Sequence, residues 1–142
     1  MDLTSSRAAG VTAAALLTGV AGFQAALAAG APWGVLAYGG ATAGTLPDAL
    51  RTSSALVVPV YVGLAAVAAG AVGSPRARLA LTRAGAVLMT VGAVVNLASP
   101  SLPERLLWVP VTAATAVALW RAAPAVDGPE RLGRGRVAGS PG

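Results

Sequence analysis

Long apolar runs alternate with short polar breaks along this chain, and most charged residues lie in or beside the breaks. The charge-free stretches run between Arg7 and Asp48, between Arg51 and Arg76, and between Arg83 and Glu104. Each is longer than the roughly 18 apolar residues that indicate a transmembrane helix. The pattern therefore predicts an all-α, four-helix transmembrane bundle with spans at about 8–30, 47–72, 79–98 and 104–121.

The fourth predicted span has the shortest apolar core. Its uncharged part, 106–120, has 15 residues and covers roughly 22 Å as a helix. It therefore needs its flanking turns, and arginine side chains that extend to the interface, to cross a bilayer. Pro59 and Pro110 lie inside the second and fourth spans, where each is expected to kink its helix.

A glycine-rich segment, GAPWGVLAYGG at 30–40, separates the first two spans. Pro32 ends a helix, and the glycines allow backbone conformations that other residues avoid. Trp33 and Tyr38 suit the level of the lipid headgroups. We expect a structured outer loop at 31–45, and a re-entrant segment lining a polar cavity remains an alternative.

Short polar motifs mark the other helix boundaries. TLPD at 45–48 and SLPE at 101–104 have the pattern of capping boxes, with Thr45 and Ser101 as the N-caps. GSPRAR at 73–78 predicts a tight turn. The likeness of the two capping motifs, and of VVPV to WVPV, favours two repeated helical hairpins, although chance similarity is an alternative in such an Ala- and Val-rich chain.

The composition agrees with a membrane protein. Of the 142 residues, 56% are hydrophobic and 11% are charged, whereas soluble domains have about 25% charged residues. We expect one transmembrane domain at 1–123 and a disordered cytoplasmic tail at 124–142. A cleaved signal peptide is the alternative for the first apolar run, but that run is longer than the roughly 7–15 apolar residues of such peptides.

The arginines predict the orientation. All ten basic residues are arginine. With four spans, eight of them lie on the side of the termini, and only Arg51 and Arg105 lie on the other side. The positive-inside rule then gives a multi-pass protein of the cell membrane with both termini cytoplasmic.

Several chemistries are excluded by the residues that are missing. The chain has no Cys, His or Lys, which removes thiol nucleophiles, imidazole bases, serine–lysine pairs and the usual zinc and haem ligands. We predict no catalytic residue, no metal and no cofactor. Nucleic acid is not an expected partner either, because the arginines flank the spans.

The polar residues expected near the 31–45 loop form a candidate ligand-binding group. They are Gln24, Trp33, Tyr38, Asp48, Arg51, Asn96, Ser101, Glu104 and Arg105. The amides are the most informative members, since buried amides need hydrogen-bond partners. We expect Glu104 to face Arg51, or a backbone donor in the loop. The alternative is that Asp48 and Glu104 only cap helices.

The motifs GAPWG…YGG, LPDALR and SLPER, together with Asn96, Ser99, Trp108 and Pro110, resemble small four-span bacterial membrane proteins of uncharacterised function. The resemblance covers residues 8–121. It implies the four-span fold, and it implies no activity, substrate or cofactor.

These observations favour a non-enzymatic membrane protein, an accessory, assembly or lipid-interacting subunit with an outward-facing polar pocket. One alternative is an oligomeric permease or channel for small solutes. Another is an isomerase-like enzyme that uses Asp48 or Glu104. The expected partners are the lipid bilayer and either another membrane protein or further copies of this chain.

Overall fold

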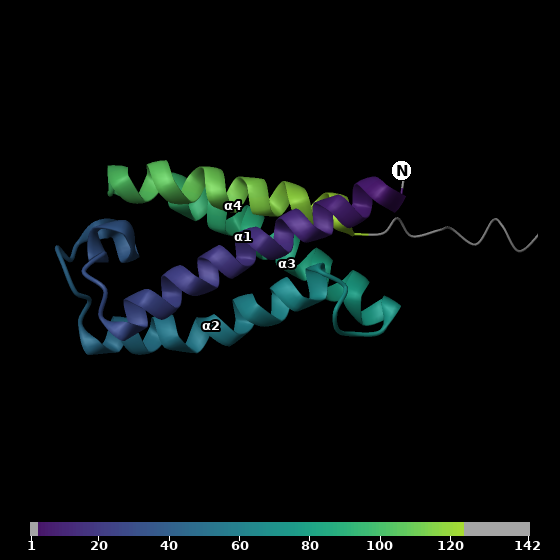
Figure 1. Cartoon of the computed structure of the whole chain (residues 1–142). Helices are drawn as coiled ribbons and strands as arrows, with labels where there is room; N and C mark the ends of the chain where they lie inside the picture. The colour runs from purple at the N-terminus through teal and green to yellow at the C-terminus, as the bar shows by residue number, and fades with distance from the viewer. Residues whose placement is uncertain (1–2, 124–142) are drawn as a thin grey trace, which may run out of the picture.

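The computed structural model describes residues 3–123, and this part of the chain is all-α (Figure 1). Its helices are α1 (Leu3–Ala29), α2 (Asp48–Ala68), α3 (Pro75–Leu97) and α4 (Leu102–Ala122). Two short 3₁₀ turns, η1 (Gly34–Leu36) and η2 (Tyr38–Gly40), lie between α1 and α2. The expected four-helix arrangement is confirmed, while the tail predicted at 124–142 lies outside the described residues.

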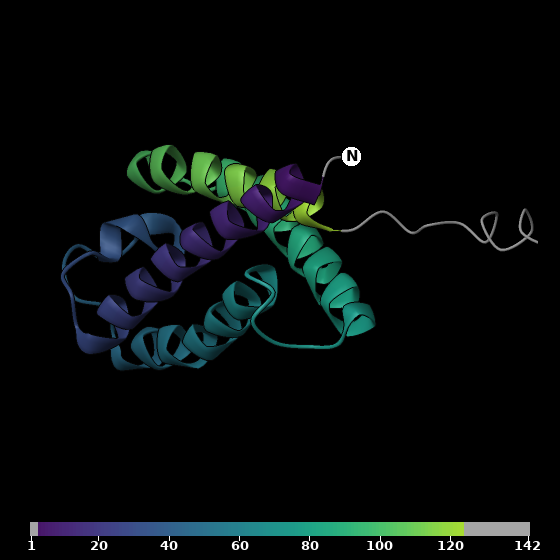
Figure 2. The same ribbon diagram turned by 45° about the vertical axis from the view of Figure 1, so that its right-hand side comes forward.

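The helices pack as two hairpins. α1 packs mainly on α2, α3 packs mainly on α4, and α1 also crosses α4 to join the two pairs. α2 and α3 touch much less, and Figure 2 shows α3 diverging from α2 beyond their connection. The apolar core lies at the crossing and is formed chiefly by Ala13, Leu17, Ala65, Ala86, Met89 and Leu119.

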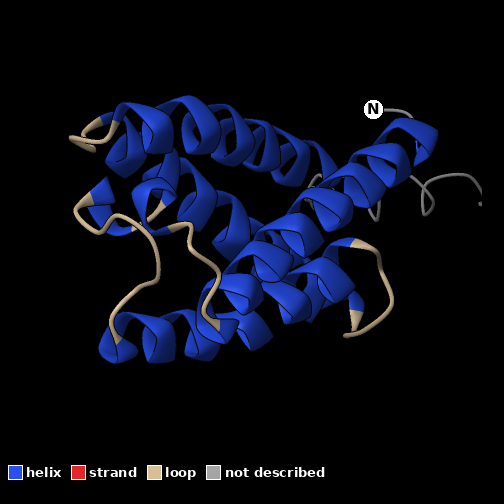
Figure 3. Ribbon diagram, turned by 60° about the vertical axis from the view of Figure 1, so that its left-hand side comes forward, coloured by secondary structure: helices blue, strands red, loops and turns tan. Residues whose placement is uncertain are grey.

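The two ends of the bundle differ. The loop end holds the 31–45 loop and the α3–α4 turn, and the opposite end holds the start of α1 and the α2–α3 connection (Figures 1 and 3). A cavity at this opposite end is lined by residues that include Arg7, Arg78 and Ala122. We call it the arginine end. The first and last described turns of the bundle therefore lie at the same end.

Two helices end at a glycine in the left-handed region. Gly30 (φ +99°) follows α1, and Gly70 (φ +76°) follows α2 shortly after its last residue. The amide of Ala31 donates to the carbonyl of Ala26 at 2.9 Å, and Ala71 repeats this bond to Ala66. These bonds satisfy helix carbonyls that would otherwise lack partners.

Three helix boundaries differ by several residues from the sequence-based prediction. α2 ends at Ala68, before the predicted residue 72. α1 begins at Leu3, before the predicted residue 8, so residues 3–7 are helical. α3 begins at Pro75, so most of the predicted 73–78 turn is also helix. The reason is that Ser74 caps α3 by accepting a hydrogen bond from the Ala77 amide at 3.3 Å, and proline is well suited to a first helical turn.

Neither predicted capping box is complete, since the Ser101 amide donates to the Ser99 hydroxyl and not to the Glu104 side chain. Ser101 caps α4 as expected and accepts from the Glu104 amide at 3.3 Å. Thr45 does not cap α2, which begins later, at Asp48. Its hydroxyl donates instead to the Gly30 carbonyl at 3.1 Å, and the following Leu46 is buried in a small apolar cluster with Leu27.

Three of the helical segments between residues 3 and 123 are long and apolar enough to cross a membrane: Thr4–Ala29, Asp48–Ala68 and Pro75–Leu97. Their outer faces expose side chains such as Leu56 and Val95, as expected for surfaces in contact with lipid. α4 is not among these candidates. The structure therefore supports a multi-pass helical membrane protein with three candidate spans.

Candidate functional site

The 31–45 loop is a compact structure. The amide of Gly34 donates to the Gly44 carbonyl at 2.8 Å, which closes the loop on itself. The backbone is so close here that a Cβ on Gly34 would lie 2.6 Å from the Thr42 carbonyl oxygen. The expectation of a structured loop is therefore met by its own hydrogen bonding and close packing.

Two side chains of the α4 region hold this loop by its backbone. The Ser101 hydroxyl donates to the Val35 carbonyl at 2.9 Å, and the Trp108 indole nitrogen donates to the Leu36 carbonyl at 2.7 Å. Gly40 packs so tightly that an added Cβ would lie 2.5 Å from the Ser101 hydroxyl oxygen. The loop therefore folds over the start of α4.

Tyr38 fixes the loop to α2. Its hydroxyl lies 3.2 Å from the Leu50 carbonyl and 3.0 Å from the hydroxyl of Ser54, which is completely buried. Tyr38 has a φ of +53°, a conformation that costs a non-glycine residue on the order of 1–2 kcal/mol. These contacts offset that strain and keep the tyrosine in place.

Aromatic rings join α1, the loop and α4. Phe23 stacks on Trp33 with ring centroids 5.8 Å apart, and it meets Trp108 edge-on at 4.6 Å. Such pairs contribute about 0.5–1.5 kcal/mol beyond their burial. Trp33 is therefore packed against the bundle on one face, although the residue stays 43% exposed.

A cavity of about 280 Å³ lies beneath the loop, among all four helices. Four of the predicted site residues line it: Gln24, Tyr38, Asn96 and Glu104. The sequence analysis did not assign Phe23, Tyr61, Trp108 or Thr112 to the site, and they line it too. Tyr61 lies inside an apolar helix, and its part in the cavity depends on how the two hairpins pack together. We call this space the loop-end cavity.

Glu104 brings a carboxylate to the loop-end cavity. The residue is only 7% exposed, and the Ser99 hydroxyl donates to its carboxylate. No arginine of the described chain lies within ion-pair distance of it. Burying a charge costs several kcal/mol. The dipole of helix α4, whose first turn holds Glu104, offsets about 0.3–2 kcal/mol of this cost. The carboxylate thus lacks a full counter-charge.

Several polar groups of the same cavity also lack partners. The Oε1 atom of Gln24 is buried without a hydrogen bond, a situation that costs roughly 1–3 kcal/mol. Within residues 3–123, the Asn96 amide and the Tyr61 hydroxyl form no hydrogen bond either. A polar molecule in the cavity would satisfy these groups.

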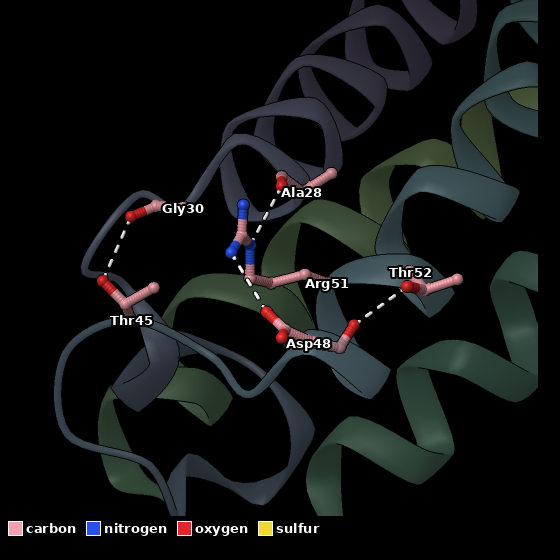
Figure 4. Close-up of polar contacts among 6 residues, drawn as sticks. All are labelled: Ala28, Gly30, Thr45, Asp48, Arg51 and Thr52. Atoms are coloured by element: carbon pink, nitrogen blue, oxygen red, sulfur yellow. Dashed lines mark hydrogen bonds and ion pairs between the residues drawn. The ribbon is translucent and has the colours of Figure 1, made fainter.

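Asp48 and Arg51 lie elsewhere (Figure 4). Arg51 donates to the Ala28 carbonyl at 3.1 Å and to the Asp48 carboxylate at 3.3 Å, so it caps the end of α1. Asp48 is 97% exposed. These two residues border a separate shallow hollow with Thr52 and Ala55. The expected approach of Glu104 to Arg51 is wrong, because each has a nearer partner.

The nine predicted site residues thus fall into three groups and one isolated residue, Arg105. Four line the loop-end cavity, as described above. Trp33 and Ser101 support the loop above it. Asp48 and Arg51 lie at the α1–α2 junction, and Arg105 is exposed on α4. Among the described residues, no group of three or more His, Cys, Asp or Glu is placed to hold a metal ion.

No protein-family model, curated protein or solved structure matches this chain. The resemblance to small four-span bacterial membrane proteins is therefore not accompanied by a family assignment. The helices and their hydropathy support the broader description, a small helical membrane protein with three candidate spans.

Proposed function

We propose that this chain is a non-enzymatic membrane protein, an accessory, assembly or lipid-interacting subunit, that binds a small polar or lipid-derived ligand in the loop-end cavity. One observation carries the proposal. The cavity combines the buried Glu104 carboxylate, without a basic partner in the described chain, with the unpartnered Oε1 of Gln24. A buried carboxylate without a counter-charge and a buried amide oxygen without a hydrogen bond both cost free energy. A polar ligand in the cavity would reduce both costs.

The proposal includes α4 as a fourth span. α4 has 21 residues, as many as α2, and it packs along α3 and α1, two of the candidate spans. A helix held in this way lies at the same depth as its neighbours. Both termini then belong to the arginine end, which becomes the cytoplasmic side, and the loop-end cavity faces outward.

A channel through a single bundle is disfavoured by the core. Along α1, the loop-end cavity involves Gln24, the core involves Leu17 and Ala13, and the arginine end involves Arg7. The other helices show the same order. Both Leu17 and Ala13 are fully buried, so apolar side chains separate the two polar ends, and the loop-end cavity serves better as a binding site than as an entrance.

The residues of the cavity also favour binding over catalysis. Its ionisable side chains are Glu104, Tyr38 and Tyr61, and the sequence offers no His, Cys or Lys to act with them. Histidine is the most common general acid or base in proteins, and it is absent from the sequence. Glu104 alone is better suited to hold a ligand than to turn it over.

Cysteine labelling tests the topology directly, because the natural chain has no cysteine. Ala43→Cys in the loop should react with a membrane-impermeant maleimide on intact cells. Val72→Cys and Arg121→Cys, both exposed at or near the arginine end, should react only after the membrane is permeabilised. Labelling of Arg121→Cys on intact cells would contradict a fourth span.

Ligand retention tests the site. The protein extracted into native-lipid particles should carry a small molecule or lipid that mass spectrometry detects after denaturation. Asn96→Leu should lose it, whereas Ser53→Leu, at an exposed position of α2, should keep it. Equal retention by both variants, or no bound molecule in the natural protein, would refute a ligand site here.

A further inference from the structure

We propose that the ligand of the loop-end cavity is a small organic cation, a primary amine or a methylated ammonium group. This inference rests on the proposed binding function and names the chemical class of the ligand. It follows from three properties of the cavity: an acid without a counter-charge, a set of aromatic rings, and amides that lack partners.

The charge of the cavity selects a cation. Glu104 contributes the carboxylate, and none of the cavity-lining residues is basic. Arg51 is held at Ala28 and Asp48, and Arg105 is exposed. An anionic ligand would add like charge to a buried acid, whereas an ammonium group would supply the missing counter-charge.

The rings strengthen the same preference. Phe23, Tyr38, Tyr61 and Trp108 come from α1, the loop, α2 and α4, and all of them line the cavity. The electron-rich faces of aromatic rings attract ammonium groups, and aromatic cages are a common way to bind methylated ammonium ions. An acid together with several rings therefore fits an organic cation better than a neutral sugar or a phosphate.

The amides position the rest of the ligand. The buried Oε1 of Gln24 can accept a hydrogen bond from an ammonium N–H or a hydroxyl. Asn96 lines the same space from α3. A volume of about 280 Å³ holds a headgroup rather than a whole lipid. Ethanolamine- and choline-type groups share this chemistry, whether they are free in solution or attached to a lipid.

Binding measurements on the full chain in an uncharged maltoside detergent test this inference. Tryptophan fluorescence would follow titration with choline, ethanolamine and 3,3-dimethylbutan-1-ol, the neutral analogue of choline. The cations should bind at least about tenfold more tightly than the neutral analogue. A second set of titrations would use short-chain phosphatidylcholine and phosphatidylethanolamine. Tighter binding of the lipids assigns a membrane source, and tighter binding of the free amines assigns a soluble one.

The variants separate charge from folding. Glu104→Gln keeps an acceptor for Ser99 and should reduce the preference for cations to about twofold or less. Asp48→Asn, the exposed first-turn acid of α2, should keep the full preference. Tyr61→Leu retains bulk, and its loss of the ring should weaken binding of choline but not of the neutral analogue.

The possible failures are distinguishable. Equal binding of choline and its neutral analogue, or an unchanged preference in Glu104→Gln, would overturn the cation assignment while leaving a ligand site in place. Failure of every probe to bind, together with the absence of a retained molecule in native-lipid particles, would overturn the proposed function as well.

Discussion

The indole nitrogen of Trp108 donates a hydrogen bond to the backbone carbonyl of Leu36 at 2.7 Å, between positions 72 residues apart in the chain. This bond joins the second hairpin to the loop of the first. The same indole ring meets Phe23 of α1 edge-on. One side chain thus fixes the loop, contributes to the aromatic cluster and lines the cavity.

Trp108→Phe keeps an aromatic ring and removes the N–H donor. We expect it to lower the free energy of unfolding in detergent by about 1–3 kcal/mol, because the Leu36 carbonyl loses its partner. Trp120→Phe is the matched control, since Trp120 is half exposed and its indole nitrogen donates a long hydrogen bond, 3.4 Å, to the Thr90 hydroxyl. Equal losses in the two variants, measured by thermal and denaturant unfolding, would contradict the role given to the Leu36 bond.

Ser101→Ala should cost more than Ser74→Ala. Both serines cap a helix through a 3.3 Å bond from an amide, which is worth about 0.5–2 kcal/mol. Ser101 also donates to the Val35 carbonyl, which adds about 0.5–1.5 kcal/mol. Denaturant unfolding of the two variants measures the difference, and a Ser74→Ala loss as large as that of Ser101→Ala would show that the loop bond contributes nothing.

Gly40→Ala should be much more harmful than Gly44→Ala. Both glycines have a positive φ, +69° and +89°, so an alanine at either position costs about 1–2 kcal/mol of strain. Only the Cβ at position 40 would collide with Ser101, whereas position 44 has no neighbouring atom within 4 Å. The collision should add about 1–3 kcal/mol, and thermal midpoints that fall equally would show that the loop moves aside freely.

Arg51→Gln and Glu104→Gln should have additive effects on stability. The two side chains have separate partners, Ala28 and Ser99, and residues without shared partners add within about 0.3–0.5 kcal/mol. A double-mutant cycle by denaturant unfolding measures the coupling. A coupling energy above about 1 kcal/mol would instead indicate a direct ion pair between Arg51 and Glu104 across the two hairpins.

The sequence pattern was enough to predict four helices and the position of the loop, because both depend on local hydropathy and on glycine and proline. The two capping motifs show where local rules stop. TLPD and SLPE have the same pattern, yet only Ser101 caps its helix. Thr45 is drawn to the Gly30 carbonyl by the packing of the loop on α1, and this is a tertiary contact that no short motif encodes.

The candidate site was predictable to a similar extent. Gln24 and Asn96 stood out as isolated amides in apolar helices, and both line the cavity. Arg51 was assigned to Glu104 because opposite charges were expected at the same end, but a nearby helix carbonyl holds it instead. Tyr61 and Trp108 were not assigned to the site, because only the packing of the two hairpins brings them to the cavity.

The loop is held through main-chain atoms, and this has a consequence for how its sequence can vary. Ser101 and Trp108 recognise the carbonyl oxygens of Val35 and Leu36, so the identity of those two side chains is of little importance to the attachment. The sequence is restricted instead at Gly34 and Gly40, since an added Cβ at either position would lie less than 3 Å from another atom. A library that randomises the loop should therefore accept many residues at 35 and 36 and return glycine at 34 and 40.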